Sequence, residues 1–223
     1  MTPAHPAHHA RPPGRAGGVA RWCWLAALLP LLTACAGTLL PKPAPAPARF
    51  TLDTGPAAPP APGARVLPAD APTLTVDLPR AAPGYDSRRM VYQRRPQQME
   101  AFAFHEWVEP PAQMLAPLLV RALQDQGGFR AVLRAPSAAA GGWRLETELL
   151  RLHQDFSLRP SQVRLSVRAV LLNSATRQAV AWREFDVSVA ATGDDPVAGA
   201  AAAQAAARQL ANEVAAFSAE RAR

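Results

Sequence analysis

Short segments in which apolar and polar residues alternate predict most of the secondary structure. "TLTVDLP" (73–79) alternates with period two, which is typical of a strand with one buried face. The segments 89–93 and 99–104 flank the polar, proline-containing "RRPQ" and predict a hairpin. A shorter strand is predicted in "RFTLD" (49–53). We expect the hydrophobic core to lie after about residue 73.

The second half of the chain repeats this alternation in three longer segments, 143–157, 163–173 and 179–190. The last two are separated by a polar turn, so consecutive antiparallel strands are expected. Within the first segment the apolar positions change parity after Leu149. A change of parity inside one strand predicts a bulge or a twist at that point.

Two segments carry helical periodicity instead. The first opens at Pro110 and Pro111, repeats leucine every four residues and ends at Gly127 and Gly128, where a positive φ is accessible to glycine. Pro117 lies inside it, which predicts a kink or a later helix start. Asp195 and Pro196 are typical of an N-cap and a first helical residue, and an alanine-rich segment follows them. Its small side chains predict close packing against a sheet.

The order of these elements predicts an α/β fold. We expect a single domain in which a mixed, largely antiparallel sheet packs with two main helices. The domain is expected to cover residues 49–223. A membrane-surface role for the last helix is disfavoured, because its polar side has no row of lysines.

The N-terminal segment predicts export and lipidation. Residues 1–34 combine three arginines, no acidic residue and the uncharged run "WCWLAALLPLL" (22–32), which is too short to span a bilayer but suits a secretory signal. "LTAC", which ends at Cys35, resembles the lipobox of bacterial lipoproteins. In a lipobox the cysteine receives a diacylglycerol thioether, becomes the mature N-terminus and is then N-acylated, commonly with palmitate. The alternative is an ordinary buried or redox cysteine.

Removal of the signal peptide would change both the charge and the cysteine content. The formal net charge falls from +7 to +4, because Arg11, Arg15 and Arg21 leave with residues 1–34. Cys23 leaves too, so the mature chain has Cys35 alone and neither a disulfide nor a cysteine metal cluster is expected. The Pro/Ala-rich segment 35–48, which begins at the lipidated cysteine, is predicted to be a tether. No basic run interleaved with aromatics suggests nucleic-acid binding.

Few side chains suit catalysis. His105 with Glu106, and His153 with Asp155 and Ser157, form the tight clusters of reactive groups after the signal peptide. Neither a Gly-x-Ser-x-Gly elbow, an HExxH pair nor a phosphate-binding glycine loop is present, so no catalytic residue, metal or cofactor is predicted. An envelope hydrolase that uses His153 and Ser157 stays a weaker alternative.

The predicted hairpin carries the candidate partner-binding residues. Four arginines are concentrated there and can bind carboxylates or phosphates. Two tyrosines and a tryptophan accompany the arginines. These aromatic residues could contact a partner or pack within the sheet, and we favour packing. A charged sheet edge that protects against aggregation is the alternative for the arginines. The candidates are Tyr85, Arg88, Arg89, Tyr92, Arg94, Arg95 and Trp107.

Residues 84–133 also carry a family resemblance. This block contains a Tyr-Asp-Ser-Arg stretch, a Trp followed by prolines before an amphipathic helix, and a Gly-Phe exit into a strand. The order of these three features resembles that in the auxiliary lipoproteins of ABC-type transport systems. The likeness extends more loosely over residues 49–217. Pro117 and the Pro/Ala-rich N-terminal third depart from the pattern.

The resemblance implies a non-catalytic component of a lipid transport system. Its expected partners are a periplasmic MCE-domain protein and an ABC permease with its ATPase, and its expected place is the periplasmic face of the outer membrane of a Gram-negative bacterium. Ala36, rather than aspartate, after the cysteine favours that membrane by the same resemblance. A purely structural or scaffold lipoprotein is the main alternative.

Overall fold

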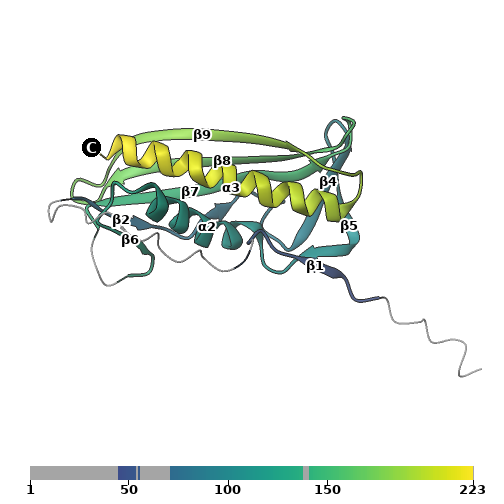
Figure 1. Ribbon diagram of the computed structural model, residues 1–223, viewed down its shortest axis with the longest axis horizontal. Coiled ribbons are helices and arrows are strands. Elements are labelled where there is room, and N and C mark those ends of the chain that lie inside the picture. The colour runs from purple at the N-terminus through teal and green to yellow at the C-terminus, as the bar shows by residue number, and fades with distance from the viewer. Residues whose placement is uncertain (1–44, 54, 56–70, 138–140, 223) are drawn as a thin grey trace, which may run out of the picture. The chain divides into compact units, whose positions relative to one another are not determined.

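The computed structural model describes residues 45–53, 55, 71–137 and 141–222 (Figure 1). The proposed signal peptide, Cys35 and the tether up to residue 44 lie outside these described residues. Residues Ala46–Arg223 form one compact unit.

Two helices and nine strands make up the described part of this unit (Figure 1). The helices are α2 (Pro111–Gln126) and α3 (Pro196–Arg221). The strands are β1 (Ala48–Phe50), β2 (Thr73–Val76), β3 (Arg80–Ala81), β4 (Arg89–Arg95), β5 (Gln98–Trp107), β6 (Ala131–Arg134), β7 (Trp143–Asp155), β8 (Gln162–Asn173) and β9 (Gln178–Ala190).

Strand β7 is the centre of the sheet. On one side it pairs along its length with β8, and β8 pairs with β9, both antiparallel. On its other side β7 pairs in parallel with three short segments in turn, β2, β3 and β4. Strands β4 and β5 form an antiparallel hairpin, and β1 pairs in parallel with β5. Strand β6 pairs in parallel with β2. The sheet is therefore mixed, and its long ladders are antiparallel, as predicted.

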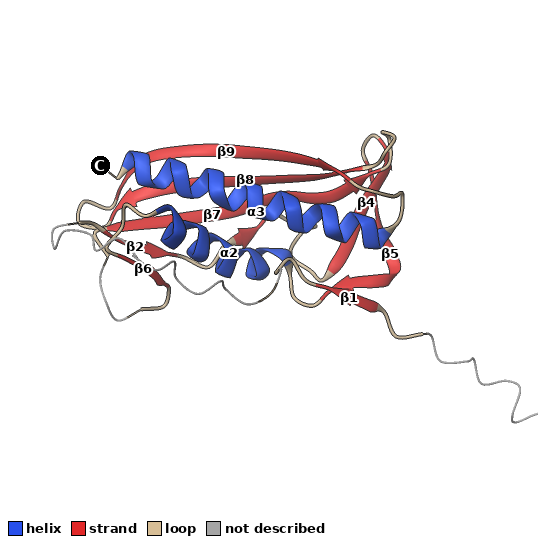
Figure 2. Cartoon of the chain, viewed as in Figure 1, coloured by secondary structure: helices blue, strands red, loops and turns tan. Residues whose placement is uncertain are grey.

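Both helices cover the same face of this sheet (Figure 2). Helix α3 packs on β8 and β9 and also contacts α2, which reaches β6 and β7. Its buried positions are mostly alanine, with larger apolar residues such as Leu210 and Val214 among them, so the helix axis can approach the strands closely. The described residues contribute one hydrophobic core. The expectation of a single α/β domain is confirmed.

The local signals at the helix ends work as expected. Helix α2 ends at Gln126 and is capped by Gly127, whose φ of 72° suits glycine. The Asp195 carboxylate accepts hydrogen bonds from the backbone N–H groups of Val197 and Ala198 at 2.8 and 2.9 Å, which caps α3. Helix α2 starts at Pro111 and includes Pro117, so the later start that Pro117 suggested does not occur.

The parity change in β7 corresponds to a bulge. The register with β8 shifts between Leu149 and Arg151, which confirms the predicted irregularity. After the bulge, Gln154 points toward α3, where a Cβ at Gly199 would collide with the Gln154 Oε1 atom. The Gln154 amide donates to Ser161 Oγ at 2.9 Å. The same amide donates to Asp195 O at 3.3 Å, so it fixes the start of α3 against β7.

Several details differ from the sequence prediction. Leu52 is completely buried, so the core begins earlier than residue 73. Strand β2 ends at Val76 instead of continuing to residue 79, and β3 was not predicted. Strand β6 occupies the place that the family resemblance implied. Among the described helices, none is both long and apolar enough to cross a membrane.

Candidate functional site

The structure separates the candidate hairpin residues into a base and a turn. At the base, Arg88 accepts a hydrogen bond at its carbonyl from Trp107 N (2.8 Å), and Arg89 lies opposite Glu106. Arg94 and Arg95 lie at the other end, next to the turn. Arg95 lies six residue steps along the strand from Arg89, a distance of about 20 Å. The four arginines therefore form two groups rather than one patch.

Two of the aromatic candidates are part of the core. Trp107 is 4% exposed and Tyr92 is 7% exposed. The Tyr92 ring packs on Phe102, with centroids 4.4 Å apart, and meets Phe156 edge-on at 5.7 Å. Packing within the sheet is thus the role that the structure favours for both, and neither offers a surface to a partner without rearrangement.

Tyr92 links the hairpin strands through a small polar cluster. Its hydroxyl donates to Glu100 Oε2 at 2.8 Å and accepts from Arg94 Nη2 at 3.3 Å, and the Arg94 guanidinium lies 5.1 Å from the ring centroid. The hydrogen bond to Glu100, with burial, raises the pKa of Tyr92 above its ordinary value. Arg94 is therefore held against the hairpin by a hydrogen bond and a cation–π contact.

The remaining candidates are accessible. Arg88, Arg89, Arg94 and Arg95 are exposed, and none of them forms an ion pair within the described part of the chain. Tyr85 is half-buried, and burial raises the pKa of its hydroxyl against the opposing effect of Arg151. Unpaired guanidinium groups are free to bind carboxylates or phosphates of a partner.

The reactive cluster on β7 lacks the arrangement of a catalytic triad. Ser157 Oγ donates to Asp155 Oδ1 at 2.5 Å instead of to a histidine, and Asp155 also pairs with Arg164 at 3.1 Å. Burial opposes ionisation of Asp155, but the hydrogen bonds from Ser157 and the charge of Arg164 outweigh it and lower its pKa. His153 is 5% exposed, and neither of its ring nitrogens has a hydrogen-bond partner in the described part of the chain. A nucleophilic serine needs its base within hydrogen-bond reach, which is not the geometry seen here.

His153 is held in its neutral form. Burial, reinforced by the positive charge of Arg151, lowers the pKa of His153 from 6.5 to about 4, although Asp155 acts in the opposite direction. In the unfolded chain the imidazole would keep an ordinary pKa. Between these two values the unfolded state binds a proton that the folded state does not.

The fold should therefore lose stability as the pH falls from 6.5 toward 4. Because the folded pKa is the lower one, the contribution of His153 is complete above pH 6.5, and about 2 kcal/mol should be lost between pH 7 and pH 5. Urea unfolding at pH 7 and at pH 5 measures this loss in the free energy of unfolding. A His153→Gln variant should show a clearly smaller loss; an equal loss would mean that other groups control the pH dependence.

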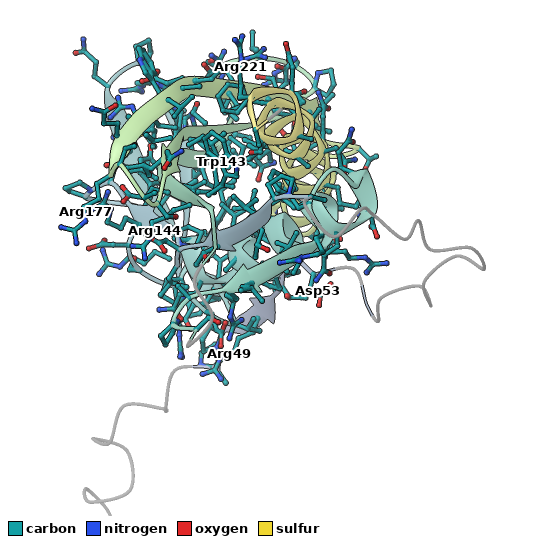
Figure 3. The ribbon with its side chains drawn as sticks, turned by 90° about the vertical axis from the view of Figure 1, so that its left-hand side faces the viewer. Arg49, Asp53, Trp143, Arg144, Arg177 and Arg221 are labelled. Carbon is teal, nitrogen blue, oxygen red and sulfur yellow. The ribbon has the colours of Figure 1, made fainter. Side chains whose placement is uncertain are left out.

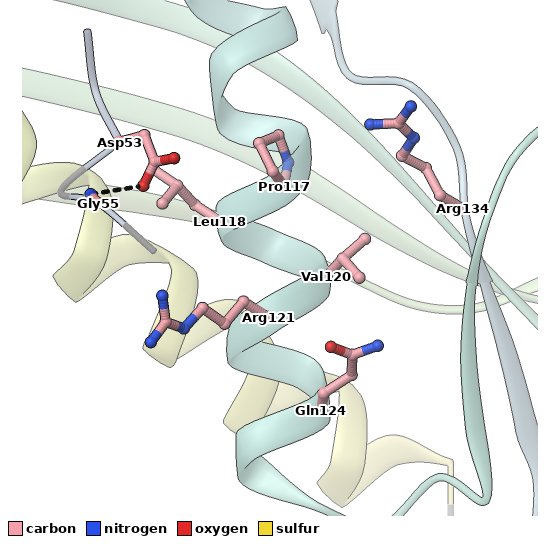
Figure 4. A pocket seen from close by; sticks show the side chains of 8 residues that line it. All are labelled: Asp53, Gly55, Pro117, Leu118, Val120, Arg121, Gln124 and Arg134. Carbon is pink, nitrogen blue, oxygen red and sulfur yellow. Dashed lines mark hydrogen bonds between the residues drawn. The ribbon is translucent and has the colours of Figure 1, made fainter. Parts of the chain in front are cut away.

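Two further features of the surface were not predicted from the sequence. A groove of about 520 Å³ lies beside α2, lined by Arg121, Gln124 and Arg134 together with apolar side chains (Figure 4). On the helix-free face of the sheet, Trp182 of β9 is 66% exposed. The same face carries Arg144, which appears with Arg177 on the side away from α3 in Figure 3. Among the described residues, no group of His, Cys, Asp and Glu side chains is arranged to hold a metal ion.

Comparisons with known proteins agree with the fold. A family model described as "ABC-type transport auxiliary lipoprotein component" matches residues 50–215. The crystal structure of protein XCC0632 from Xanthomonas campestris, of the DUF330 family, is 25% identical with a TM-score of 0.67 and covers 78% of this chain and 95% of its own. A second crystal structure, of an uncharacterized protein, is 16% identical with a TM-score of 0.60 over 78% of this chain and 99% of its own, and shows the fold alone. A search of curated proteins finds no match.

Proposed function

This chain belongs to the family of ABC-type transport auxiliary lipoprotein components, and on that premise we propose that it is a lipid-anchored, non-catalytic partner of an ABC transporter in the bacterial envelope. The observation that carries the proposal is the family match, which covers the folded domain almost from end to end. The transport system would be of the MCE type and would move lipids between the two membranes. Its partners would be a periplasmic MCE-domain protein and the permease with its ATPase.

The anchor would be a lipid on Cys35. The lipobox-like "LTAC" after an apolar run supports it, and so does the description of the family as lipoproteins. Residues 1–34 would be removed as a signal peptide, 35–48 would tether the domain, and 49–223 would carry the function. Ala36 after the cysteine favours the periplasmic face of the outer membrane.

The geometry on β7 supports a role without catalysis. The Ser157 hydroxyl is engaged by Asp155, and the His153 imidazole is buried away from it. Burial also keeps His153 neutral and gives it no acceptor or donor among the described residues to orient it. A domain of this kind acts by binding.

The base of the hairpin is the surface that we assign to the protein partner. Arg88 and Arg89 are exposed there and form no ion pair with any residue that the structure describes, and the half-buried Tyr85 is close to them in the chain. Glu106, opposite Arg89, pairs instead with Arg49 at 4.0 Å, so it leaves the Arg89 guanidinium available to a partner. An acidic surface on the partner would complement it.

A photo-crosslinking residue in place of Arg89 should form an adduct with the MCE-domain protein. The adduct is expected because the side chain at this position is exposed and directed to solvent. Mass spectrometry of the crosslinked band in cells that express the transport system identifies the partner.

The matched control is the same probe at Arg208, an exposed arginine of α3 on the helical layer. Adducts at Arg208 with none at Arg89 would place the partner on the helices instead. No adduct with any transport component from either position would favour a scaffold lipoprotein.

A further inference from the structure

Three loops that are distant in the sequence form one end of the domain. The β4–β5 turn lies beside the β7–β8 turn, where Phe156 N donates to Gln93 O at 2.8 Å. The β7–β8 turn is in turn joined to the β9–α3 loop: Ala191 N donates to Ser161 O at 2.8 Å, and Ser161 N donates to Asp194 Oδ1 at 2.9 Å. We call these loops (94–99, 157–161 and 191–197) the three-loop tip.

The three-loop tip combines exposed apolar and basic side chains. One large apolar side chain protrudes from each loop: Met99 is 43% exposed, Leu158 is 41% exposed and Val197 is 59% exposed. Arg94, Arg95 and Arg159 are also exposed, and none of them forms an ion pair in the described structure. Apolar side chains among arginines are typical of surfaces that rest on a membrane interface.

The carboxylates of the tip are already engaged within the fold. Asp195 caps α3 through two backbone N–H groups, Asp194 accepts from Ser161 N, and Glu100 accepts from the Tyr92 hydroxyl. The capping N–H groups, the Ser161 N–H group and the Tyr92 hydroxyl partly offset the negative charge of these carboxylates. Arg94 keeps donors beyond the one that it gives to Tyr92, and the charge of Arg159 acts on Asp194, but no ion pair within the described residues occupies Arg94, Arg95 or Arg159, so the tip can present their guanidinium groups to an external anion.

The described chain enters the domain from the side of this same end. Strand β1 runs parallel to β5 with Ala48 beside His105, so the chain before Ala48 approaches from the side of the β4–β5 turn (Figure 1). Seven residues of β5 lie between that level and the turn at Gln98, which is about 23 Å. The twelve residues between Cys35 and Ala48 can span at most about 43 Å. The tether is therefore long enough for the tip to touch the membrane that holds the anchor.

We propose that the three-loop tip rests on the membrane that holds Cys35, where Arg94, Arg95 and Arg159 bind the phosphates of anionic phospholipids and Met99, Leu158 and Val197 enter the interface. This rests on the proposed lipidation of Cys35. The contact would hold the domain in a fixed orientation, with the hairpin base and the long sheet directed away from the bilayer. An anchored domain that is oriented in this way presents one face to its partner at a constant height.

Site-specific fluorescence quenching tests the contact. The lipidated mature chain has no other cysteine, so a Gln98→Cys variant accepts one fluorophore at the tip, and an Ala175→Cys variant accepts one in the turn at the far end. The proteins are inserted into vesicles of phosphatidylethanolamine and phosphatidylglycerol in equal parts, with a nitroxide quencher on some headgroups. Vesicles in which phosphatidylcholine replaces phosphatidylglycerol give the uncharged comparison.

The label at position 98 should be quenched in the anionic vesicles and the label at position 175 should not. Each arginine at an anionic surface contributes a factor of about five in affinity. Changing Arg94, Arg95 and Arg159 to glutamine should therefore abolish the quenching. The matched control changes Arg177, Arg183 and Arg208, three exposed arginines outside the tip, and should leave it intact.

Flotation of the same vesicles separates this inference from the anchor. If the protein floats but the label at position 98 is unquenched, or is quenched equally in both lipid mixtures, the tip does not bind anionic lipid and the anchored function stands. If the protein does not float, the anchor itself is wrong and the inference falls with it. If the fluorescence of the label at position 98 changes only when MCE-domain protein is added, and not on contact with the vesicles, the tip binds a protein partner and the proposed membrane contact is wrong.

Discussion

Replacing Leu210 with alanine should lower the free energy of unfolding by about 2–5 kcal/mol. Leu210 is completely buried on α3, the helix that contacts α2, β8 and β9. Its neighbours along α3 are mostly alanine, so no long side chain on the same helix is available to fill the space that it leaves. The cavity should persist, and the cost should lie in the upper part of that range.

Chemical denaturation of the wild type and the variant at constant pH measures this difference. The comparison requires that the free energy of unfolding depends on denaturant concentration with the same slope in both proteins. Leu78→Ala is the matched control, because Leu78 is 54% exposed and its truncation should cost well under 1 kcal/mol. Equal losses for both variants would contradict the packing of α3 described above.

The long elements could be predicted because their signals are local. Alternation over ten or more residues specified β7, β8 and β9, and short polar turns joined them in antiparallel order. The parity change in β7 located the bulge, since each side chain must point to one face or the other. Asp195 and Gly127 marked the helix ends through chemistry within one turn of each helix.

The short parallel pairings could not be predicted in this way. Strands β2, β3 and β4 each occupy a different stretch of the same edge of β7, and nothing within segments of two to seven residues specifies such a partner. Leu52 illustrates the same limit, because its burial depends on α3 and the sheet rather than on its own Pro/Ala-rich surroundings. Tertiary contacts decide these cases.

For the same reason, the candidate site could be predicted from the sequence only in part. The sequence located the exposed arginines of the hairpin and favoured packing for Tyr92 and Trp107, which are buried, but it could not show that the arginines form two separate groups. Leu158 and Val197 carried no signal at all. They join Met99 only because the turn at 157–161 and the loop at 191–197 fold against the hairpin.

Replacing Cys35 with alanine should abolish membrane attachment. A thioether-linked diacylglycerol together with an N-acyl chain contributes about 0.8 kcal/mol for each buried CH₂ group, far more than the residual charge of the mature chain can supply. Without the thiol the lipid cannot be attached, so the chain should leave the membrane fraction at high salt or remain as an uncleaved precursor. Membrane flotation and mass spectrometry of the N-terminus distinguish these products from the lipidated protein.

Cys23→Ala is the control for this experiment, because Cys23 lies in the apolar run that the signal peptidase would remove. This variant should be lipidated and retained like the wild type. Salt washing then separates the two sources of attachment: lipid insertion is insensitive to ionic strength, whereas a contact through arginines weakens as counterions screen it. A Cys35→Ala protein that has lost residues 1–34 and still floats at high salt would show that the domain is held by something other than a lipid on Cys35.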